Sequence, residues 1–101
     1  MRDFSHIERY ERILDEGEDL LSELGRILER LSDHEKEYRE LLGWYGSDEW
    51  RKDLDDDETG LIPDSIRRGV LSEDGIWDHS VEHQDAALRM MEVALEMMKS
   101  R

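Results

Sequence analysis

The sequence has no cysteine, a single proline and few aromatic residues (7%) among its 101 positions. Without cysteine, neither a disulfide framework nor thiolate chemistry is available. No apolar run approaches the length of a signal-peptide core or a membrane span. We therefore expect a cytoplasmic protein that does not bind membranes.

Basic residues are also scarce, since 14 lysines and arginines stand against 28 acids and give a net charge of −14. A negative field of this size repels DNA, RNA and anionic lipids, so direct nucleic-acid binding is not expected. A basic protein surface or a cation is the natural complement. Glycine-rich phosphate loops and nucleophile elbows are absent as well. The sequence therefore predicts a protein that is not an enzyme and needs no cofactor.

What is abundant is helical periodicity. Residues 5–45 predict one long helix, because ten of twelve positions in two seven-residue series are apolar or aromatic. The two series are Ile7, Leu14, Leu21, Leu28, Glu35, Leu42 and Tyr10, Gly17, Leu24, Leu31, Tyr38, Tyr45. Ser5 is the expected N-cap, with Glu8 as its capping-box partner. Residues 76–99 repeat the pattern in a shorter helix whose apolar face is rich in methionine.

The 30 residues between these helices, 46–75, predict an acidic crossover punctuated by glycine and Pro63. Within it, 47–54 favours a helical turn or two capped by Ser47, and 63–69 favours a short helix. The expected fold is all-α, with residues 1–101 as a single domain. In this fold the long helix packs antiparallel on the shorter C-terminal helix. Because the shorter helix cannot cover the whole apolar seam, a homodimer stays open.

The crossover concentrates carboxylates in the stretch RKDLDDDETGLIPD, which raises two metal hypotheses. Asp53, Asp55, Asp57 and Asp64 occupy calcium-ligand positions of a twelve-residue EF-hand window, but position 6 is Glu58 where that loop needs glycine. His79 and His83 stand four residues apart on the last helix, a spacing that can hold zinc. Both patterns are incomplete, so we predict no metal site and keep a cation-binding module only as an alternative.

The same carboxylates could imitate nucleic-acid phosphates, because basic proteins recognise a dense row of negative charge. Beside them lies an aromatic cluster of Trp44, Tyr45, Trp50 and Trp77, which would be an interface hot spot if exposed and would anchor the crossover if buried. The pattern favours burial. The candidate partner-binding residues are Asp48, Glu49, Asp53, Asp55, Asp56, Asp57, Glu58, Trp44, Tyr45 and Trp50.

The stretches WYGSDEWRKD and GVLSEDGIWD resemble the signature segments of a small bacterial family, domain of unknown function 4298. The similarity covers about residues 8–98. The matching positions are Trp44, Tyr45, Ser47, Trp50, Gly69, Val70, Leu71, Ser72, Glu73 and Asp74. This resemblance implies a bacterial or phage setting and a helical fold, and it implies no activity.

Taken together, these patterns predict a non-enzymatic interaction module that binds a basic surface of a nucleic-acid-binding protein. Its concrete form would be a nucleic-acid-mimicking inhibitor of the anti-CRISPR or phage counter-defence type. The alternatives are a bacterial housekeeping adaptor with an aromatic interface, and a divalent-cation-binding module.

Overall fold

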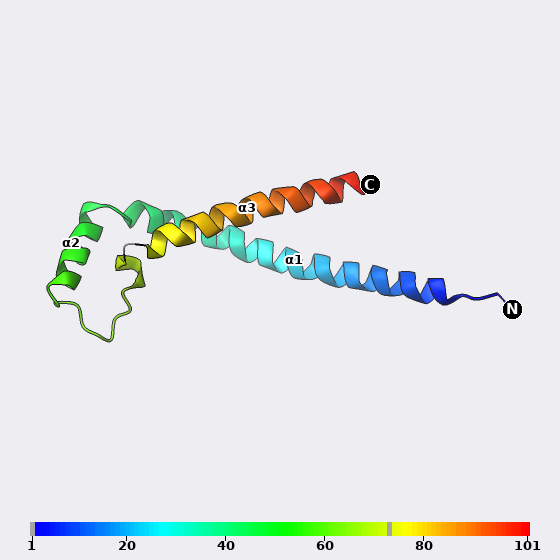
Figure 1. Ribbon diagram of the computed structural model, residues 1–101, viewed down its shortest axis with the longest axis horizontal. Helices are drawn as coiled ribbons and strands as arrows, with labels where there is room; N and C mark the ends of the chain where they lie inside the picture. The colour runs from blue at the N-terminus through cyan, green and yellow to red at the C-terminus, as the bar shows by residue number, and fades with distance from the viewer. Residues whose placement is uncertain (1, 73) are drawn as a thin grey trace. The chain divides into compact units, whose positions relative to one another are not determined.

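The computed structural model describes residues 2–72 and 74–101. Over these residues it contains three α-helices, α1 (Ser5–Trp44), α2 (Asp48–Glu58) and α3 (Gly75–Lys99), one short 3-10 helix, η1 (Gly69–Leu71), and no strand (Figure 1). The all-α prediction is confirmed, with a long helix first, a short one in the crossover and a third at the C-terminus. In the same described residues, no helix is both long and apolar enough to cross a membrane.

The chain divides into two compact units, residues 1–40 and 41–101, and α1 runs through the border. The single domain and the antiparallel packing of the two long helices therefore stay predictions.

Helix α1 is continuous over 40 residues, as its unbroken seven-residue pattern predicts. At its start, the Asp3 carboxylate accepts hydrogen bonds from the Ser5 backbone N–H (2.9 Å) and the Ser5 hydroxyl (3.0 Å). These bonds, the backbone one first, lower the pKa of Asp3 because they favour its charged form. The acceptor at the N-terminus is thus Asp3, where the sequence favoured Ser5.

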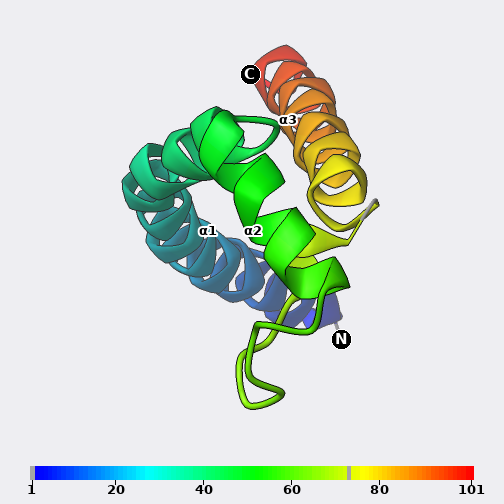
Figure 2. The ribbon, with the colours of Figure 1, turned by 90° about the vertical axis from the view of Figure 1, so that its left-hand side faces the viewer.

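Helix α2 is longer than the sequence suggested, because it extends through the acidic run to Glu58. The helix predicted at 63–69 is wrong. Ile66 N–H donates to the Pro63 carbonyl (3.0 Å) in a turn, and the next helical residues are those of η1. Figure 2 shows the loop that leaves the end of α2 and returns towards α3. The Arg68 side chain donates to the Ile62 carbonyl (3.3 Å), which holds this loop in a form that a helix could not keep.

Buried side chains are few, and among the described residues only Tyr38, Leu71 and Ile76 are buried apolar ones. Leu71 and Ile76 belong to the unit of residues 41–101, where η1 contacts both α2 and α3. The core of this unit therefore lies at the junction between η1 and the start of α3. Helix α3 begins one residue earlier than predicted and ends at Lys99, as predicted.

Candidate protein-interaction face

Helix α2 carries most of the candidate residues, and both of its ends are fixed. The Ser47 hydroxyl caps the N-terminus by accepting from the Trp50 backbone N–H (3.2 Å). At the C-terminus, Leu61 N–H donates to the Asp56 carbonyl (2.9 Å) while Gly60 adopts φ +76°. This is a Schellman motif, which needs a residue in the left-handed region and so favours glycine. The acidic stretch therefore forms a rigid helix with a defined end.

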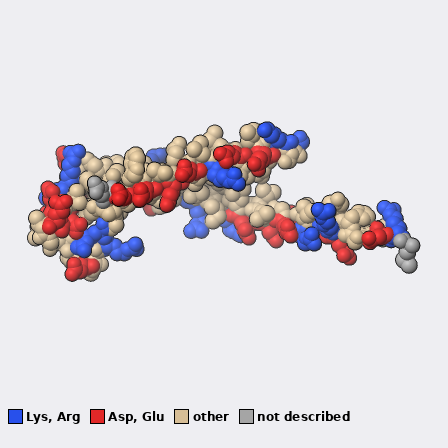
Figure 3. Space-filling view, viewed as in Figure 1, with Lys and Arg blue, Asp and Glu red and all other residues tan. Residues whose placement is uncertain are grey.

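The carboxylates of α2 separate into two groups by exposure. Asp53, Asp56 and Asp57 are half-buried. The exposed ones are Asp48, Glu49, Asp55 and Glu58. On the face shown in Figure 3, acidic side chains gather over α2 and along the first half of α3. Only the exposed group is positioned to meet a large partner.

Arg68 neutralises part of the half-buried group. Its Nε lies 3.2 Å from Asp57 Oδ1, and its Nη1 lies 3.9 Å from Asp64 Oδ1. The side chains of Arg68 and Asp57 are 34% and 28% exposed, so water screens this pair less than it screens the other ion pairs of the helix. Asp57 sits in the last turn of α2, where the helix dipole disfavours a negative charge. The guanidinium offsets that cost.

A hollow of about 310 Å³ lies beside this ion pair. It mixes acids, arginines and apolar groups, and the residues that line it include Trp44, Asp53, Asp56, Ile62, Pro63, Arg67 and Arg68. Because two arginines stand beside two carboxylates, the hollow has no strong excess of either charge. It is shallow and open, and its chemistry is typical of a structural junction.

The aromatic cluster is largely structural. Trp44, Tyr45 and Trp50 are all half-buried, and the rings of Tyr45 and Trp50 meet edge to face at 5.2 Å. Trp50 Nε1 also donates a hydrogen bond to the Val70 carbonyl (3.1 Å). This bond joins the two signature segments across 20 residues of sequence. Trp77, by contrast, is 60% exposed.

The second signature segment builds the joint between η1 and α3. The Ser72 hydroxyl donates to the Gly69 carbonyl (2.7 Å) and accepts from the Gly75 backbone N–H (3.0 Å). A Cβ on Gly75 would lie 2.5 Å from that same carbonyl oxygen, so only glycine fits. Glu73 lies outside the described residues. The Ser72 hydroxyl thus accepts from the first backbone N–H of α3.

The residues of the calcium pattern do not form an EF-hand loop. Asp53, Asp55 and Asp57 lie on helix α2, where Asp53 and Asp57, four residues apart, share a face and Asp55 points away from them. In residues 2–72 and 74–101, no group of three or more histidines and acids is placed to hold a metal ion. His79 is exposed and His83 is half-buried.

The structure brings together residues that sequence patterns did not connect. Arg68 and Val70 hold two candidate residues, Asp57 and Trp50, yet they stand 11 and 20 positions away. No spacing rule links residues across an irregular loop, so no sequence pattern predicts either contact.

The ion pair predicts unequal effects of two isosteric substitutions in α2. Asp57→Asn should lower the free energy of unfolding by about 1–2 kcal/mol, because it leaves a half-buried guanidinium without its closest carboxylate. Asp55→Asn is the matched control, since Asp55 is exposed in the same helix, and it should change stability by under about 0.5 kcal/mol. Urea titrations of both variants measure the difference. Equal effects would show that the Arg68 contact contributes nothing.

The chain belongs to the family described as domain of unknown function (DUF4298), whose model matches residues 7–93. The resemblance carried by the two signature segments is thereby confirmed. No curated protein and no solved structure matches the chain.

Proposed function

We propose that this member of the DUF4298 family is a non-enzymatic interaction module that binds a basic protein surface through the outer side of α2. One observation carries the proposal. Four carboxylates stand exposed on a helix whose two ends are both fixed, namely Asp48, Glu49, Asp55 and Glu58. The net charge of −14 adds a long-range field that would steer a basic partner towards the protein. A cytoplasmic location is part of this proposal.

The partner we infer is a nucleic-acid-binding protein, with the module acting as a nucleic-acid mimic of the anti-CRISPR or phage counter-defence type. From Asp48 to Glu58 the helix rises about 15 Å, so its four exposed carboxylates stand at an average interval of about 5 Å. Each strand of a DNA duplex carries one phosphate per about 3.4 Å of the helix axis. The charge density is of the same order, which supports a surface that competes with nucleic acid.

The two alternatives have weaker support. A housekeeping adaptor that binds through aromatic residues would have to use rings that are already half-buried, and the Trp50 indole N–H already has an acceptor. The exposed Trp77 is the one observation that favours it. A cation-binding module has little support, because among residues 2–72 and 74–101 no group of three or more histidines and acids is placed to hold a metal ion.

The test neutralises the outer side of α2 with Asp48→Asn, Glu49→Gln, Asp55→Asn and Glu58→Gln together. The matched control removes four exposed carboxylates from α3, through Asp78→Asn, Glu82→Gln, Asp85→Asn and Glu92→Gln. Each variant is immobilised and exposed to host lysate at about 50 and 200 mM salt, and retained proteins are identified by mass spectrometry.

We expect the wild type and the control to retain the same basic nucleic-acid-binding protein at low salt and to release it at high salt. The α2 variant should bind that protein at least about tenfold more weakly, because rigidly placed charges give the interface its complementarity. A single-stranded oligonucleotide should compete with the wild type. Retention that is equal for both variants, or unaffected by salt, would overturn the proposal.

A further inference from the structure

Helix α1 carries a wide apolar stripe that is exposed along most of its length. Every large apolar side chain from Ile7 to Leu31 is between 41% and 64% exposed. Three of every seven positions contribute, which is the width of a helix face that packs on other helices. A contiguous surface of this kind exceeds the scattered apolar residues of an ordinary protein surface and marks an interface.

We propose that this stripe binds the α1 helix of a second copy of the chain, antiparallel, about a two-fold axis near residues 22 and 23. In this register, residues whose numbers sum to about 45 lie opposite each other. Leu14 then faces Leu31, and Leu21 faces Leu24 of the other copy. Gly17 faces Leu28, so the larger side chain fills the space that glycine leaves. A parallel pair would stack Gly17 on Gly17 and leave a gap.

The charges beside the stripe select this register. One row of residues at seven-residue spacing borders the stripe: Arg9, Glu16, Glu23, Arg30 and Glu37. With the axis at 22–23, Arg9 lies opposite Glu37 and Glu16 lies opposite Arg30, which the symmetry repeats to give four pairs. At the two-fold axis Glu23 lies opposite Glu23 of the other copy, and this is the single pair of like charges in the row. Complementary flanking charges are the usual determinant of pairing between helices.

Shifting one helix along the other by seven residues in either direction reduces the number of opposite-charge pairs. One shift puts Arg9 opposite Arg30 and Glu16 opposite Glu23. The other puts Glu16 opposite Glu37, which offsets the favourable pairing of Glu23 with Arg30. The register near 22–23 is therefore the one that gives this row the most pairs of opposite charge.

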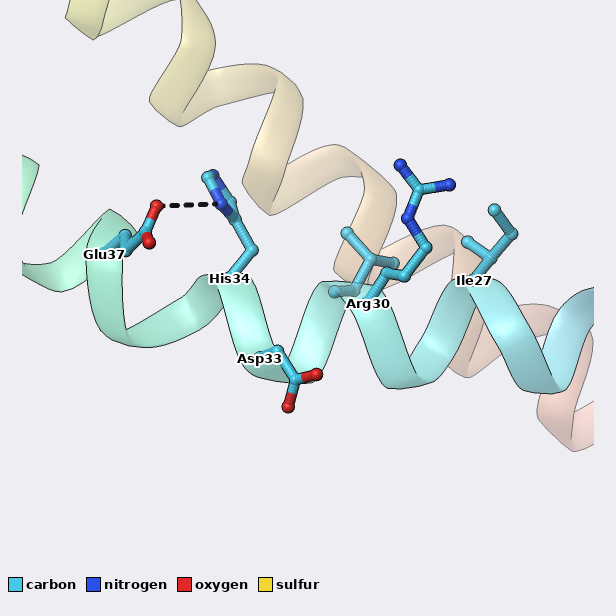
Figure 4. A pocket seen from close by; sticks show the side chains of 6 residues that line it. Ile27, Arg30, Asp33, His34 and Glu37 are labelled. Carbon is cyan, nitrogen blue, oxygen red and sulfur yellow. Dashed lines mark ion pairs between the residues drawn. The ribbon is translucent and has the colours of Figure 1, made fainter.

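A hollow of about 510 Å³ lies on α1, at the place where this register puts side chains of the second copy. It is lined by Ile27, Arg30, Leu31, Asp33, His34 and Glu37. The second copy would place Leu20 opposite Ile27 and Leu14 opposite Leu31, with Glu16 and Arg9 at the charged rim. Figure 4 shows Glu37 paired with His34, and their nitrogen and oxygen lie 3.7 Å apart. Such an exposed pair rearranges at little cost.

The first measurement is the mass of the full chain in solution by sedimentation equilibrium. A dimer of two 12.0 kDa chains is expected. Arg30→Glu should weaken dimerisation by about tenfold or more. The substitution places a glutamate opposite Glu16 of the other copy, and the two-fold axis repeats this repulsion. Adding Glu16→Arg should restore dimerisation. Within one chain these residues stand 14 positions apart on α1, about 21 Å, so the rescue can only act between copies.

The absence of cysteine allows orientation to be measured with single spin labels on the side of α1 opposite the stripe. Asp19→Cys and Arg26→Cys should give equal, short distances between copies, offset by about 10 Å along the axis. Arg12→Cys and Asp33→Cys should give equal, longer distances, offset by about 32 Å. A monomer, four equal distances, or a charge swap without rescue would each overturn the inference, and none of them bears on the acidic side of α2.

Discussion

Gly75→Ala should lower the free energy of unfolding by about 1–3 kcal/mol. The new Cβ would lie 2.5 Å from the Gly69 carbonyl oxygen and 2.6 Å from the Ser72 hydroxyl oxygen, and the carbonyl belongs to the backbone, which cannot move away cheaply. Relieving an overpacked contact of this kind costs about that amount. The Ser72 hydroxyl would also lose its bond to Gly75 N–H. The joint between η1 and α3 is thus predicted to be a sensitive point of the unit 41–101.

The measurement is a urea titration followed by tryptophan fluorescence, which reports on this unit because all three tryptophans lie within residues 41–101. Gly43→Ala is the matched control. Gly43 lies in the same unit, within α1, and a Cβ there would meet nothing within 4 Å. Its replacement should leave stability unchanged or raise it by up to about 1 kcal/mol, since alanine is the better helix former. If both variants unfold at the same urea concentration, the crowding at Gly75 has no energetic effect.

Local patterns were sufficient to predict the two long helices. The seven-residue series in α1 predicts 5–45 and the structure has Ser5–Trp44, because periodic apolar residues determine where a helix can pack. Ser47 likewise identifies the start of α2, because its hydroxyl acts on a donor only three residues away. Signals of this range can be read from sequence, since both partners fall within one helical turn.

The crossover shows where such reasoning fails. Six acids between 53 and 64 read as an irregular loop, yet most of them lie in α2, which continues to Glu58 and ends in the Schellman motif at Gly60. The segment 63–69 has the residue order of a short helix, but the contacts of Arg68 hold it in another form. This second outcome depends on partners across a loop, which no local pattern specifies.

The same long-range contacts separate the candidate residues into those that stabilise the crossover and those that stay exposed. No sequence pattern among the ten candidate residues distinguishes those with structural contacts from those left exposed. The Val70 carbonyl engages Trp50, and Arg68 engages Asp57, so these two candidates stabilise the crossover. The residues left exposed are the four outer carboxylates of α2. Trp50 and Val70, which belong to the two signature segments, therefore contribute to how the crossover is built.

Trp50→Ala should lower the free energy of unfolding by about 2–3 kcal/mol. It removes the edge-to-face contact with Tyr45, at a centroid distance of 5.2 Å, and the hydrogen bond to the Val70 carbonyl. The value lies at or below the low end for aromatic truncation because the side chain is half-buried. Trp50→Phe keeps a ring beside Tyr45 but loses the donor, so it should cost about 1 kcal/mol. Urea titration followed by circular dichroism measures both variants.

Trp77→Ala is the matched control, because Trp77 lies in the same unit and is 60% exposed. It should cost under about 1 kcal/mol, since little of its surface leaves water on folding. A loss at Trp77 as large as that at Trp50 would contradict the assignment of Trp50 as the link between the two signature segments. If Trp50→Phe matches the wild type, the link works through ring packing alone, and the 3.1 Å bond to Val70 contributes nothing to stability.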